Sequence, residues 1–267
     1  MFTEYIVKWD LQQDGAPIRT HSSRLLPVRR HGIPAMLKVA QEPEEKFGAR
    51  LMVWWDGEGA ARVLAHDADA LLLERAQSSH ALADLARTGD SDADDRATDI
   101  LCATAAQLHA PRSKPPPALI DLPRWFASLW PAAQEYGGWL HDSATVAQAL
   151  LAAPQDPVVL HGDIHHGNVL DFGSRGWLAI DAKGLYGERG FDYANIFCNP
   201  DEASALRPGW FERRVERVAR MAGLDRRRLL QWIQAWSGLS AAWILETGEA
   251  PDIDTKIGRL AAEALKL

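Results

Sequence analysis

The stretch of sequence that decides the fold runs from His161 to Asp181 and reads HGDIHHGNVLDFGSRGWLAID. It places Asp163 and Asn168 five positions apart and then offers two more carboxylates, Asp171 and Asp181. A short irregular loop can direct Asp163 and Asn168 into one cleft, whereas a regular helix or strand of that length would not. The chemistry of the stretch therefore depends on which later aspartate returns to Asn168.

The residues between Asn168 and Asp181 predict a β-hairpin. The letters NVL before Asp171 indicate a short strand, WLAID indicates the returning strand, and the intervening DFGSRG carries the Asp, Ser and Gly that are typical of a turn. A hairpin brings its two ends together. Asp181 is therefore predicted to lie beside Asn168, and Asp171 at the far tip.

His161, Asp163 and Asn168 match H-x-D-x-x-x-x-N, the catalytic-loop pattern of protein kinases. In that pattern the aspartate accepts the proton of the acceptor hydroxyl, and the asparagine holds Mg²⁺ together with a later aspartate. The hairpin geometry predicts that this later aspartate is Asp181. We interpret the literal Asp-Phe-Gly triplet that begins at Asp171 as a coincidence.

Composition and charge limit the classes of function. The chain has 267 residues, enough for one large domain or two moderate ones, and its net charge of −7 argues against a nucleic-acid partner and suits a cationic ligand. No run of about 18 apolar residues is present, and the N-terminus lacks the apolar block of a signal peptide. We therefore expect a cytoplasmic protein without a membrane span, in which Cys102 and Cys198 are buried, reduced thiols.

The first part of the chain predicts antiparallel strands. Residues 5–23 contain two extended stretches around a turn at Asp14-Gly15, and residues 24–40 repeat this plan around a turn at His31-Gly32. The pattern predicts a meander that ends near Lys38.

Helices become the main element further along the chain. A helix is predicted to open at Pro43 and to stop at Gly57, and short strands are predicted within residues 60–66 and 70–76. From about residue 78 the pattern is helical. The sequence thus predicts a small strand-rich lobe over residues 1–77 and a larger helical lobe over residues 78–267, with the boundary near residues 76–80.

The chain resembles the aminoglycoside phosphotransferase family over nearly its whole length, and within it the streptomycin 6-kinases. The segments that carry the resemblance are THSSRLLPVR, PAMLKVA, WWDGEGAARV, ALLLERA, LHAPRS, LHGDIHHGNVLDFGSRGWLAID, GERGFDYANIF and GLSAAW. The resemblance implies an α+β, protein-kinase-like fold with a small antiparallel lobe and a larger, mainly helical lobe, and it implies the use of ATP and Mg²⁺.

Lys38 lies in AMLKVA, a form of the V-A-I-K pattern, so it is predicted to neutralise the α- and β-phosphates. Its acidic partner is predicted on the next helix. Glu44 and Glu45 are the candidates; Glu45 aligns best with the family pattern, although both could instead serve the helix dipole.

The resemblance also implies the remaining nucleotide contacts. THSS occupies the turn that covers the phosphates, so Ser22 and Ser23 are predicted to offer hydroxyl and backbone donors, with a plain polar turn as the alternative. Backbone groups near Glu74 and Ala76 are predicted to bind the adenine edge.

The catalytic loop and the segment after the hairpin supply further candidates. His161 is predicted to support the loop, one of the neighbouring histidines (His165 in our choice) to contact the substrate, and Asp192 to pin the loop from below. Glu188 is predicted either to meet a guanidinium group of the substrate or to pair with Arg189; the sequence leaves both open.

Helix geometry puts four apolar residues of the C-terminal region on one face: Trp232, Trp236, Leu239 and Trp243. Core packing explains this face best. Because C-terminal helices border the substrate pocket in the family, Trp243 and Glu246 are also substrate-binding candidates.

One departure from the family pattern lies directly after the metal aspartate. Related streptomycin kinases usually carry Pro at this position, whereas this chain has Ala182 followed by Lys183. Lys183 could pair with Asp181 and weaken metal binding, although we expect activity to survive.

The catalytic-loop pattern and the resemblance together imply a monomeric kinase that transfers the γ-phosphoryl group of ATP, with Asp163 as the base. The acceptor that the resemblance implies is a cationic aminoglycoside, namely streptomycin at its 6-position. Two alternatives stay open: a kinase of another small hydroxyl compound such as a sugar, choline or hydroxyurea, and a kinase-fold binding protein without turnover.

Overall fold

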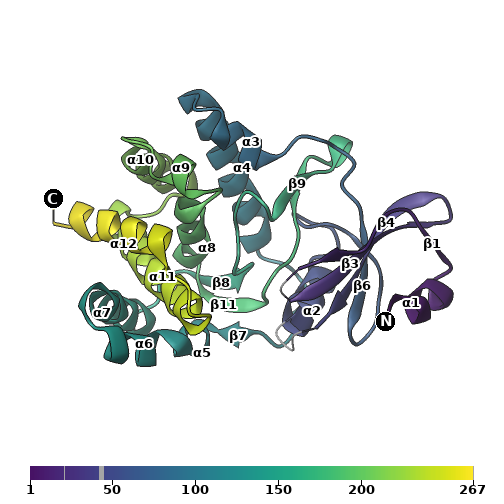
Figure 1. Cartoon of the computed structure of the whole chain (residues 1–267), viewed down its shortest axis with the longest axis horizontal. Helices are drawn as coiled ribbons and strands as arrows, with labels where there is room; N and C mark the ends of the chain where they lie inside the picture. The colour runs from purple at the N-terminus through teal and green to yellow at the C-terminus, as the bar shows by residue number, and fades with distance from the viewer. Residues whose placement is uncertain (21, 42–44, 267) are drawn as a thin grey trace.

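The computed structural model describes residues 1–20, 22–41 and 45–266, which form two lobes that lie side by side (Figure 1). The small lobe contains one antiparallel sheet in the order β1-β3-β4-β6-β5, with β2 paired to β3. Its strands are β1 (Leu11–Gln13), β2 (Ile18–Arg19), β3 (Ser23–Arg30), β4 (Ile33–Ala40), β5 (Val63–His66) and β6 (Ala70–Glu74), and its helices are α1 (Phe2–Lys8) and α2 (Glu45–Trp55).

The β3–β4 hairpin forms because its turn is His31-Gly32, whose φ angles are 50° and 80°. Two residues with positive φ match the right-handed twist of the flanking strands. Alternation along β4 then buries Ala35, Leu37 and Val39 in the core of the small lobe and turns Lys38 to the opposite face.

One predicted strand is wrong. The stretch from Tyr5 to Trp9 was expected to be extended, but residues 2–8 form helix α1. Tyr5 and Trp9 are four positions apart and both are buried, with ring centroids 5.2 Å apart, so this short apolar pattern follows the helical period. The predicted helix start at Pro43 lies outside the described residues, and the described part of α2 begins at Glu45.

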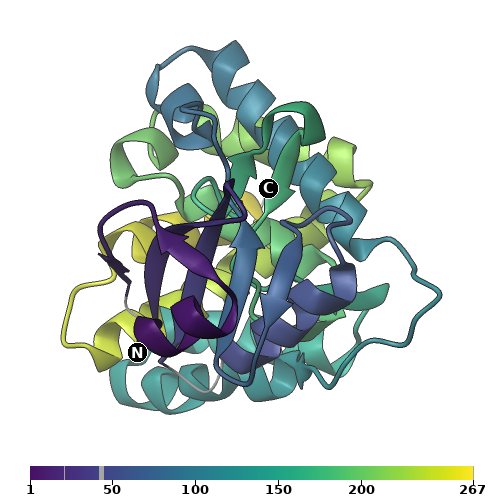
Figure 2. The ribbon, with the colours of Figure 1, turned by 90° about the vertical axis from the view of Figure 1, so that its right-hand side faces the viewer.

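The large lobe is mainly helical, as predicted. Its long helices are α4 (Ser91–His109), α6 (Leu129–Tyr136), α7 (Gly138–Ala152), α10 (Trp210–Ala222), α11 (Arg226–Glu246) and α12 (Asp252–Ala264). Shorter ones are α3 (Leu82–Arg87), α5 (Leu122–Trp125), α8 (Gly190–Ala194) and α9 (Glu202–Ala205), with 3-10 turns η1 (Phe126–Ser128), η2 (Gly173–Arg175) and η3 (Asn195–Cys198). Figure 2 shows these helices behind the small-lobe sheet.

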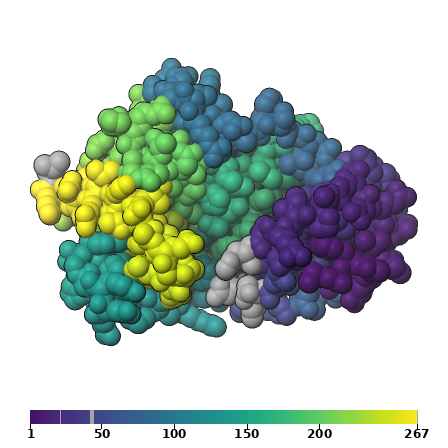
Figure 3. All heavy atoms as spheres, viewed as in Figure 1, coloured from purple at the N-terminus to yellow at the C-terminus, as the bar shows by residue number. Residues whose placement is uncertain are grey.

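Among the described residues, five short strands lie outside the small-lobe sheet, in two small sheets. The hairpin β9 (Val169–Asp171) and β10 (Trp177–Ala179) is antiparallel, and a three-stranded sheet has the order β7 (Ile120–Asp121), β11 (Leu185–Glu188), β8 (Pro157–Leu160). In the space-filling view the surface is recessed between the small lobe and the C-terminal helices, and the green middle of the chain lies in this recess (Figure 3).

The predicted lobe boundary near residues 76–80 falls in the connection between β6 and α3. Cys102 and Cys198 are both buried and free, as predicted. In the described part of the chain, no helix is long and apolar enough to cross a membrane.

Candidate active site

Asp192 on α8 fixes the start of the catalytic loop. Its carboxylate accepts hydrogen bonds from the backbone amides of His161 (2.8 Å) and Gly162 (2.7 Å), and it contacts Nε2 of His109 at 2.8 Å. The predicted anchoring of the loop by Asp192 is confirmed. The reason is physical: a buried carboxylate satisfies two backbone donors that would otherwise have no partner in the core.

His161 supports the loop by hydrogen bonds, as predicted, and it also connects the loop to the hairpin. Its Nδ1 accepts a hydrogen bond from the amide of Asp163 at 3.1 Å, so the proton is on Nε2, which lies 2.8 Å from the carbonyl oxygen of Ile180. Burial lowers the pKa of His161, which keeps the ring neutral and suited to this arrangement. A neutral ring with both nitrogens used is a structural support.

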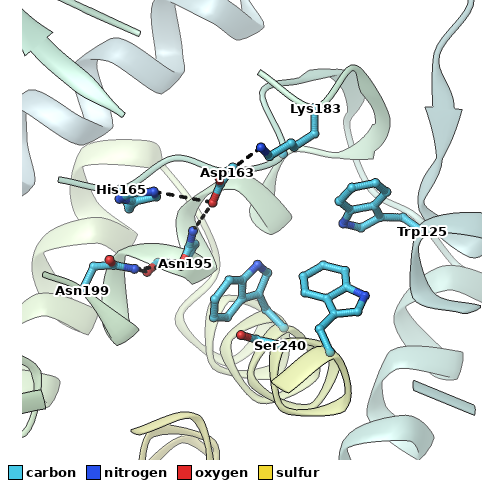
Figure 4. Close-up of a pocket in the computed structure, with 10 residues that line it drawn as sticks. Trp125, Asp163, His165, Lys183, Asn195, Asn199 and Ser240 are labelled. Atoms are coloured by element: carbon cyan, nitrogen blue, oxygen red, sulfur yellow. Dashed lines mark hydrogen bonds and ion pairs between the residues drawn. The ribbon is translucent and has the colours of Figure 1, made fainter. Parts of the chain in front are cut away.

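Asp163 projects from the loop into a cavity (Figure 4). Its Oδ1 accepts a hydrogen bond from Nδ2 of Asn195 at 2.7 Å, and its Oδ2 accepts one from Nδ2 of Asn168 at 3.0 Å. His165 lies further away, with Nε2 at 3.8 Å from Oδ1. The two amide donors hold the carboxylate in one orientation, as a base that must face an acceptor hydroxyl requires.

The hairpin has the predicted geometry. Val169 pairs with Ala179, and the amide of Ile180 donates to the carbonyl oxygen of Asn168 at 2.9 Å, so Asp181 follows directly beside Asn168. Asp171 instead lies at the tip, where it accepts from the amide of Gly173 at 2.8 Å. Of the two aspartates, only Asp181 lines the same cavity as Asn168.

Lys38 on β4 ion-pairs with both Glu45 on α2 and Asp181. Burial opposes ionisation of Asp181, but the positive charges of Lys38 and Lys183 outweigh it and lower the pKa of Asp181 to about 2. The predicted choice of Glu45 agrees with this contact, and the alternative Glu44 lies outside the described residues. The three groups join the small lobe to the hairpin.

Ser22 and Ser23 use their hydroxyl groups on Glu45. The Ser22 hydroxyl donates to Oε1 at 2.7 Å and the Ser23 hydroxyl to Oε2 at 3.3 Å. Their predicted role toward phosphates therefore falls to backbone groups, or requires that these hydrogen bonds break. Both serines also hold the acidic partner of Lys38.

A cavity of about 430 Å³ lies between the lobes on the Lys38 side. It is bounded by small-lobe residues that include the predicted Glu74 and Ala76, and by Asn168, Ile180 and Asp181 of the large lobe. The amide of Glu74 already donates to the carbonyl oxygen of Arg62 at 2.9 Å, and its side chain pairs with Arg175. The backbone groups from the carbonyl of Glu74 to Ala76 therefore stay the predicted partners of an adenine edge.

A second cavity, of about 340 Å³, opens at Asp163. Figure 4 shows Asp163, Lys183 and the amide side chains on one side of it and Trp125 on the other. The rings of Trp125 and Trp243 pack edge to face, with their centroids 5.5 Å apart. The remaining lining residues are Gly162, His165, Asn195, Asn199, Trp236 and Ser240.

Sequence reasoning found part of this second cavity. His165 and Trp243 line it, as chosen, whereas Glu246 is exposed beyond the end of the cavity wall. Trp125 and Asn199 were missed because no motif surrounds them. Asn195 had a signal, since it lies three positions after the predicted Asp192, one turn along the same short helical segment.

The structure corrects both expectations for Glu188. Its carboxylate is buried, and it accepts hydrogen bonds from Arg228 at 2.6 Å and from Nε1 of Trp232 at 2.7 Å. It lies at the end of β11 that pairs with Pro157, away from the catalytic loop. Glu188 therefore neither lines the cavity at Asp163 nor pairs with Arg189.

Trp232 and His166 are both part of the core. Trp232 is 1% exposed, so at this position the apolar face of α11 packs inward. His166 is 2% exposed, and burial lowers its pKa to about 3. His166 is thus the histidine of the neighbouring pair that packs, and His165 is the one that reaches the cavity.

Lys183 lies among three carboxylates at the junction of the two cavities. Its Nζ is 3.6 Å from Oε1 of Glu45, 3.7 Å from Oδ2 of Asp163 and 3.6 Å from Oδ2 of Asp181. Burial alone would lower the pKa of Lys183, but the negative charges of its neighbours raise it above the ordinary value. The expected contact with Asp181 exists, but Asp181 shares this lysine with two other acids.

We name the cavity that contains Lys38 the phosphate-side cavity, and the tryptophan-lined cavity at Asp163 the acceptor-side cavity. A carboxylate held between two such cavities is the arrangement expected of a protein-kinase-like small-molecule phosphotransferase. Known structures agree with this fold. The choline kinase LicA of Streptococcus pneumoniae superposes with a TM-score of 0.64 at 14% identity, covering 100% of this chain and 99% of its own. An aminoglycoside phosphotransferase of Streptomyces rimosus, solved with ADP and streptomycin, gives 0.59 at 17% identity, covering 90% and 97%.

The sequence comparisons define the family. The model of the aminoglycoside/hydroxyurea antibiotic resistance kinases matches residues 8–248. A streptomycin 3''-kinase of Klebsiella pneumoniae is 54% identical over 90% of this chain and 91% of its own length, and a streptomycin 6-kinase of Streptomyces glaucescens is 33% identical over 92% and 83%. The chain belongs to this kinase family, and it is an ATP-dependent phosphotransferase with a hydroxyl acceptor.

Proposed function

We propose that this protein phosphorylates streptomycin at its 3''-hydroxyl group with ATP and Mg²⁺ and thereby inactivates the drug. The relative at 33% identity is named a streptomycin 6-kinase, which matches the expected 6-position. The relative at 54% identity is named a streptomycin 3''-kinase. We therefore favour the 3''-hydroxyl and keep the 6-hydroxyl as the second candidate. We further propose that the chain acts in the cytoplasm as a monomer.

The observation that carries the proposal is the position of Asp163 between two cavities. Its carboxylate faces the tryptophan-lined cavity, and it is hydrogen-bonded to Asn168, which lines the cavity that contains Lys38 and Asp181. An acceptor hydroxyl in the first cavity and a triphosphate in the second would meet at this carboxylate. Such positioning supplies much of the rate in phosphoryl transfer.

The transfer can be written in terms of this chain's side chains. The carboxylate of Asp163 orients the acceptor hydroxyl and takes its proton while the new bond from oxygen to the γ-phosphorus forms. The bond from the γ-phosphorus to the bridging oxygen breaks, and ADP leaves with the electron pair. Lys38, fixed by Glu45, is placed to neutralise the α- and β-phosphates.

The residues at the phosphate-side cavity fit a magnesium ion. Asp181 offers a carboxylate with a pKa of about 2, so it is ionised at neutral pH, although Lys38 pairs with it here. Asn168 donates its amide N–H groups to Asp163, which leaves its amide oxygen as a ligand. Mg²⁺ prefers oxygen ligands and uses few protein groups together with phosphates. When bound, it would supply positive charge to the β- and γ-phosphate oxygens.

The acceptor-side cavity suits a molecule with flat cationic groups. Trp125, Trp236 and Trp243 line it, and indole faces bind guanidinium groups by stacking and cation–π attraction. Nε1 of Trp125 is buried and has no hydrogen-bond partner among the described residues, so it can donate to a substrate oxygen. These features favour guanidinium-bearing streptomycin over drugs that carry only ammonium groups.

Phosphorylation would also explain resistance. The added phosphate carries about −1.5 to −2 charges at neutral pH. A polycationic drug that binds anionic RNA loses electrostatic affinity when its net positive charge falls.

The test is a coupled ADP-release assay on the purified chain with streptomycin, kanamycin, hydroxyurea and choline as acceptors. We expect turnover with streptomycin at least a hundredfold above the others in kcat/KM, and a phosphate on the 3''-oxygen by ³¹P and ¹H NMR. Asp163→Asn should lower kcat by about 10²–10⁴-fold with an unchanged Tm, because a positioned general base contributes a factor of that size.

Three results would change the assignment. A phosphate on the 6-oxygen would support the second candidate position. Preferred turnover of hydroxyurea would make hydroxyurea the substrate instead of streptomycin. A relative from Kitasatospora aureofaciens at 31% identity is named hydroxyurea phosphotransferase. Tight streptomycin binding without ADP release would support a binding protein instead of an enzyme.

A further inference from the structure

Lys183 lies on a segment whose backbone is fixed from two sides. Its amide donates to the carbonyl oxygen of His161 at 2.7 Å, which ties it to the catalytic loop. The next residue, Gly184, has a φ of +75°, and a Cβ there would lie 2.8 Å from the backbone of Phe47 on α2. Only glycine allows this close approach. The side chain of Lys183 therefore starts from a fixed point between the loop and α2.

The ammonium group of Lys183 has spare donors. It lies 3.6–3.7 Å from one oxygen each of Glu45, Asp163 and Asp181, and within residues 1–20, 22–41 and 45–266 it makes no hydrogen bond of 3.5 Å or less. Its side chain is 20% exposed and lines the cavity that contains Asp163. An ammonium with three N–H donors in this position can bind an incoming anion without first losing a tight ion pair.

The three carboxylates place Lys183 along the path of the reaction. Asp181 belongs to the phosphate-side cavity and Asp163 to the acceptor-side cavity, and Lys183 reaches both. Lys38 contacts Asp181 and Glu45. Among the described residues, no other lysine or arginine ion-pairs with Asp163. Lys183 is thus the cation that lies next to carboxylates of both cavities.

We propose that Lys183 is a second catalytic cation, which binds the γ-phosphoryl group while that group passes from ATP to the acceptor. This inference rests on the proposed kinase reaction and adds a residue to it. Lys183 gains and loses no proton in the step: the acceptor proton goes to Asp163, and ADP takes the electron pair of the broken bond. Its charge stabilises the equatorial oxygens of the transferring group, where negative charge is concentrated in the transition state.

Two rival roles predict different behaviour. A lysine that only balances the charge of Glu45, Asp163 and Asp181 would affect the stability of the fold, with similar losses in every ligand-binding step. A lysine that competes with Mg²⁺ for Asp181 would depress activity, so its removal would increase the rate at low Mg²⁺. A catalytic cation would affect the transition state most.

The test compares Lys183→Met, which removes the charge and keeps most of the stem, with the conservative Lys183→Arg. Lys256→Met is the matched control, because Lys256 on α12 is half exposed and its one ion pair among the described residues is with Glu202. We expect Lys183→Met to lower kcat at least a hundredfold, a loss typical of a removed transition-state donor. The KM values for ATP and streptomycin should stay within about threefold of those of wild type. Lys183→Arg should recover at least a tenth of the wild-type rate, and the control should equal wild type.

A binding measurement separates catalysis from structure. The complex of Mg-ADP with aluminium fluoride mimics the transferring phosphoryl group, whereas Mg-ADP alone does not. Lys183→Met should lose at least tenfold in affinity for the analogue complex and keep its affinity for Mg-ADP within threefold. Equal losses for both ligands, a kcat within threefold of wild type, or a rate increase at low Mg²⁺ would each overturn the proposal.

Failure of the proposed substrate can be distinguished from failure of this inference. If wild type does not phosphorylate streptomycin but hydrolyses ATP, the same variants are compared in hydrolysis, where water accepts the γ-phosphoryl group. A hundredfold lower hydrolysis rate in Lys183→Met would then support the role of Lys183 with the substrate assignment overturned. A wild-type chain that shows neither reaction would overturn both.

Discussion

Asp192 and Glu188 lie four positions apart, and the contrast between them shows what a motif can predict at the residue scale. Asp192 accepts hydrogen bonds from backbone amides of the catalytic loop. Because the H-x-D-x-x-x-x-N pattern identifies that loop, the role of Asp192 could be predicted. Glu188 pairs with Arg228, which is 40 positions away and has no motif of its own. Partners of this kind are selected by packing of whole helices, and one sequence does not reveal them.

The same limit applies to the tryptophans. Eleven are present in the chain, and the helical period of α11 correctly put Trp232 in the core. The period could not separate Trp232 from Trp236 and Trp243, which share that face and yet line the cavity. What separates them is distance along the helix from the catalytic loop, which depends on how α11 lies across the lobe.

The two thiols give a prediction at this scale. Burial raises the pKa of Cys102 to about 12 and that of Cys198 well above its ordinary value. The thiolate is the reactive form, and at pH 8 an unperturbed thiol with a pKa near 8.5 would already be partly ionised. We expect neither cysteine of the folded chain to react with a disulfide reagent within minutes at pH 8, and both to react at once in concentrated denaturant. Rapid labelling of one native thiol would show that its burial is incomplete.

At the scale of elements, segments bounded by clear turn residues were predictable, and helix α1 was not. The β3–β4 hairpin, α2, β5, β6 and the β9–β10 hairpin lie where turn residues and periodicity indicated them. Helix α1 has only seven residues, and its pattern fits a strand as well as a helix until Tyr5 and Trp9 pack on the sheet. Such short elements take their structure from tertiary contacts.

The contact between α4 and α10 yields a prediction about stability. Asp94 and Arg214 are each 1% exposed and form two hydrogen bonds, of 2.5 and 2.9 Å, and Arg214 also donates to the carbonyl oxygen of Asn199 at the acceptor-side cavity. Asp94→Asn leaves the buried guanidinium without its counter-charge. We expect a loss of about 3–5 kcal/mol in the free energy of unfolding, measured by urea denaturation.

Arg213→Ala is the matched control for this change. Arg213 is the neighbour of Arg214 on the same helix and pairs with Asp95, but its side chain is 42% exposed. Exposed ion pairs contribute at most about 1 kcal/mol, so the control should lose no more than that. Similar losses in the free energy of unfolding for both variants would mean that the buried pair stabilises the contact between α4 and α10 no more than the exposed pair does.

For the molecule as a whole, the two lobes share more than a linker. Leu51, Met52 and Trp55 of α2 belong to the same buried cluster as Leu101 and Leu108 of α4, although α2 follows the small-lobe sheet in the chain. A two-lobed architecture could be predicted from the change of pattern near residue 78. The attachment of α2 to the large lobe could not, because an amphipathic helix does not specify which surface covers its apolar side.

The phosphate-side cavity depends on this joint, because its walls come from both lobes. A nucleotide that bridges them stabilises the fold by mass action, by about 2.7 kcal/mol at a concentration a hundredfold above Kd. We therefore expect saturating ADP to raise the Tm more with Mg²⁺ than with EDTA.

Asp181→Asn should abolish this Mg²⁺-dependent difference, because Asp181 lines the cavity beside Asn168. Asp171→Asn should keep the difference, because Asp171 lies at the hairpin tip. Measuring each variant with and without Mg²⁺ at one ADP concentration removes any effect of the substitution on the ligand-free Tm. A chain in which Asp171→Asn loses the difference and Asp181→Asn keeps it would place the metal at the literal Asp-Phe-Gly triplet and would overturn the hairpin argument for the metal carboxylate.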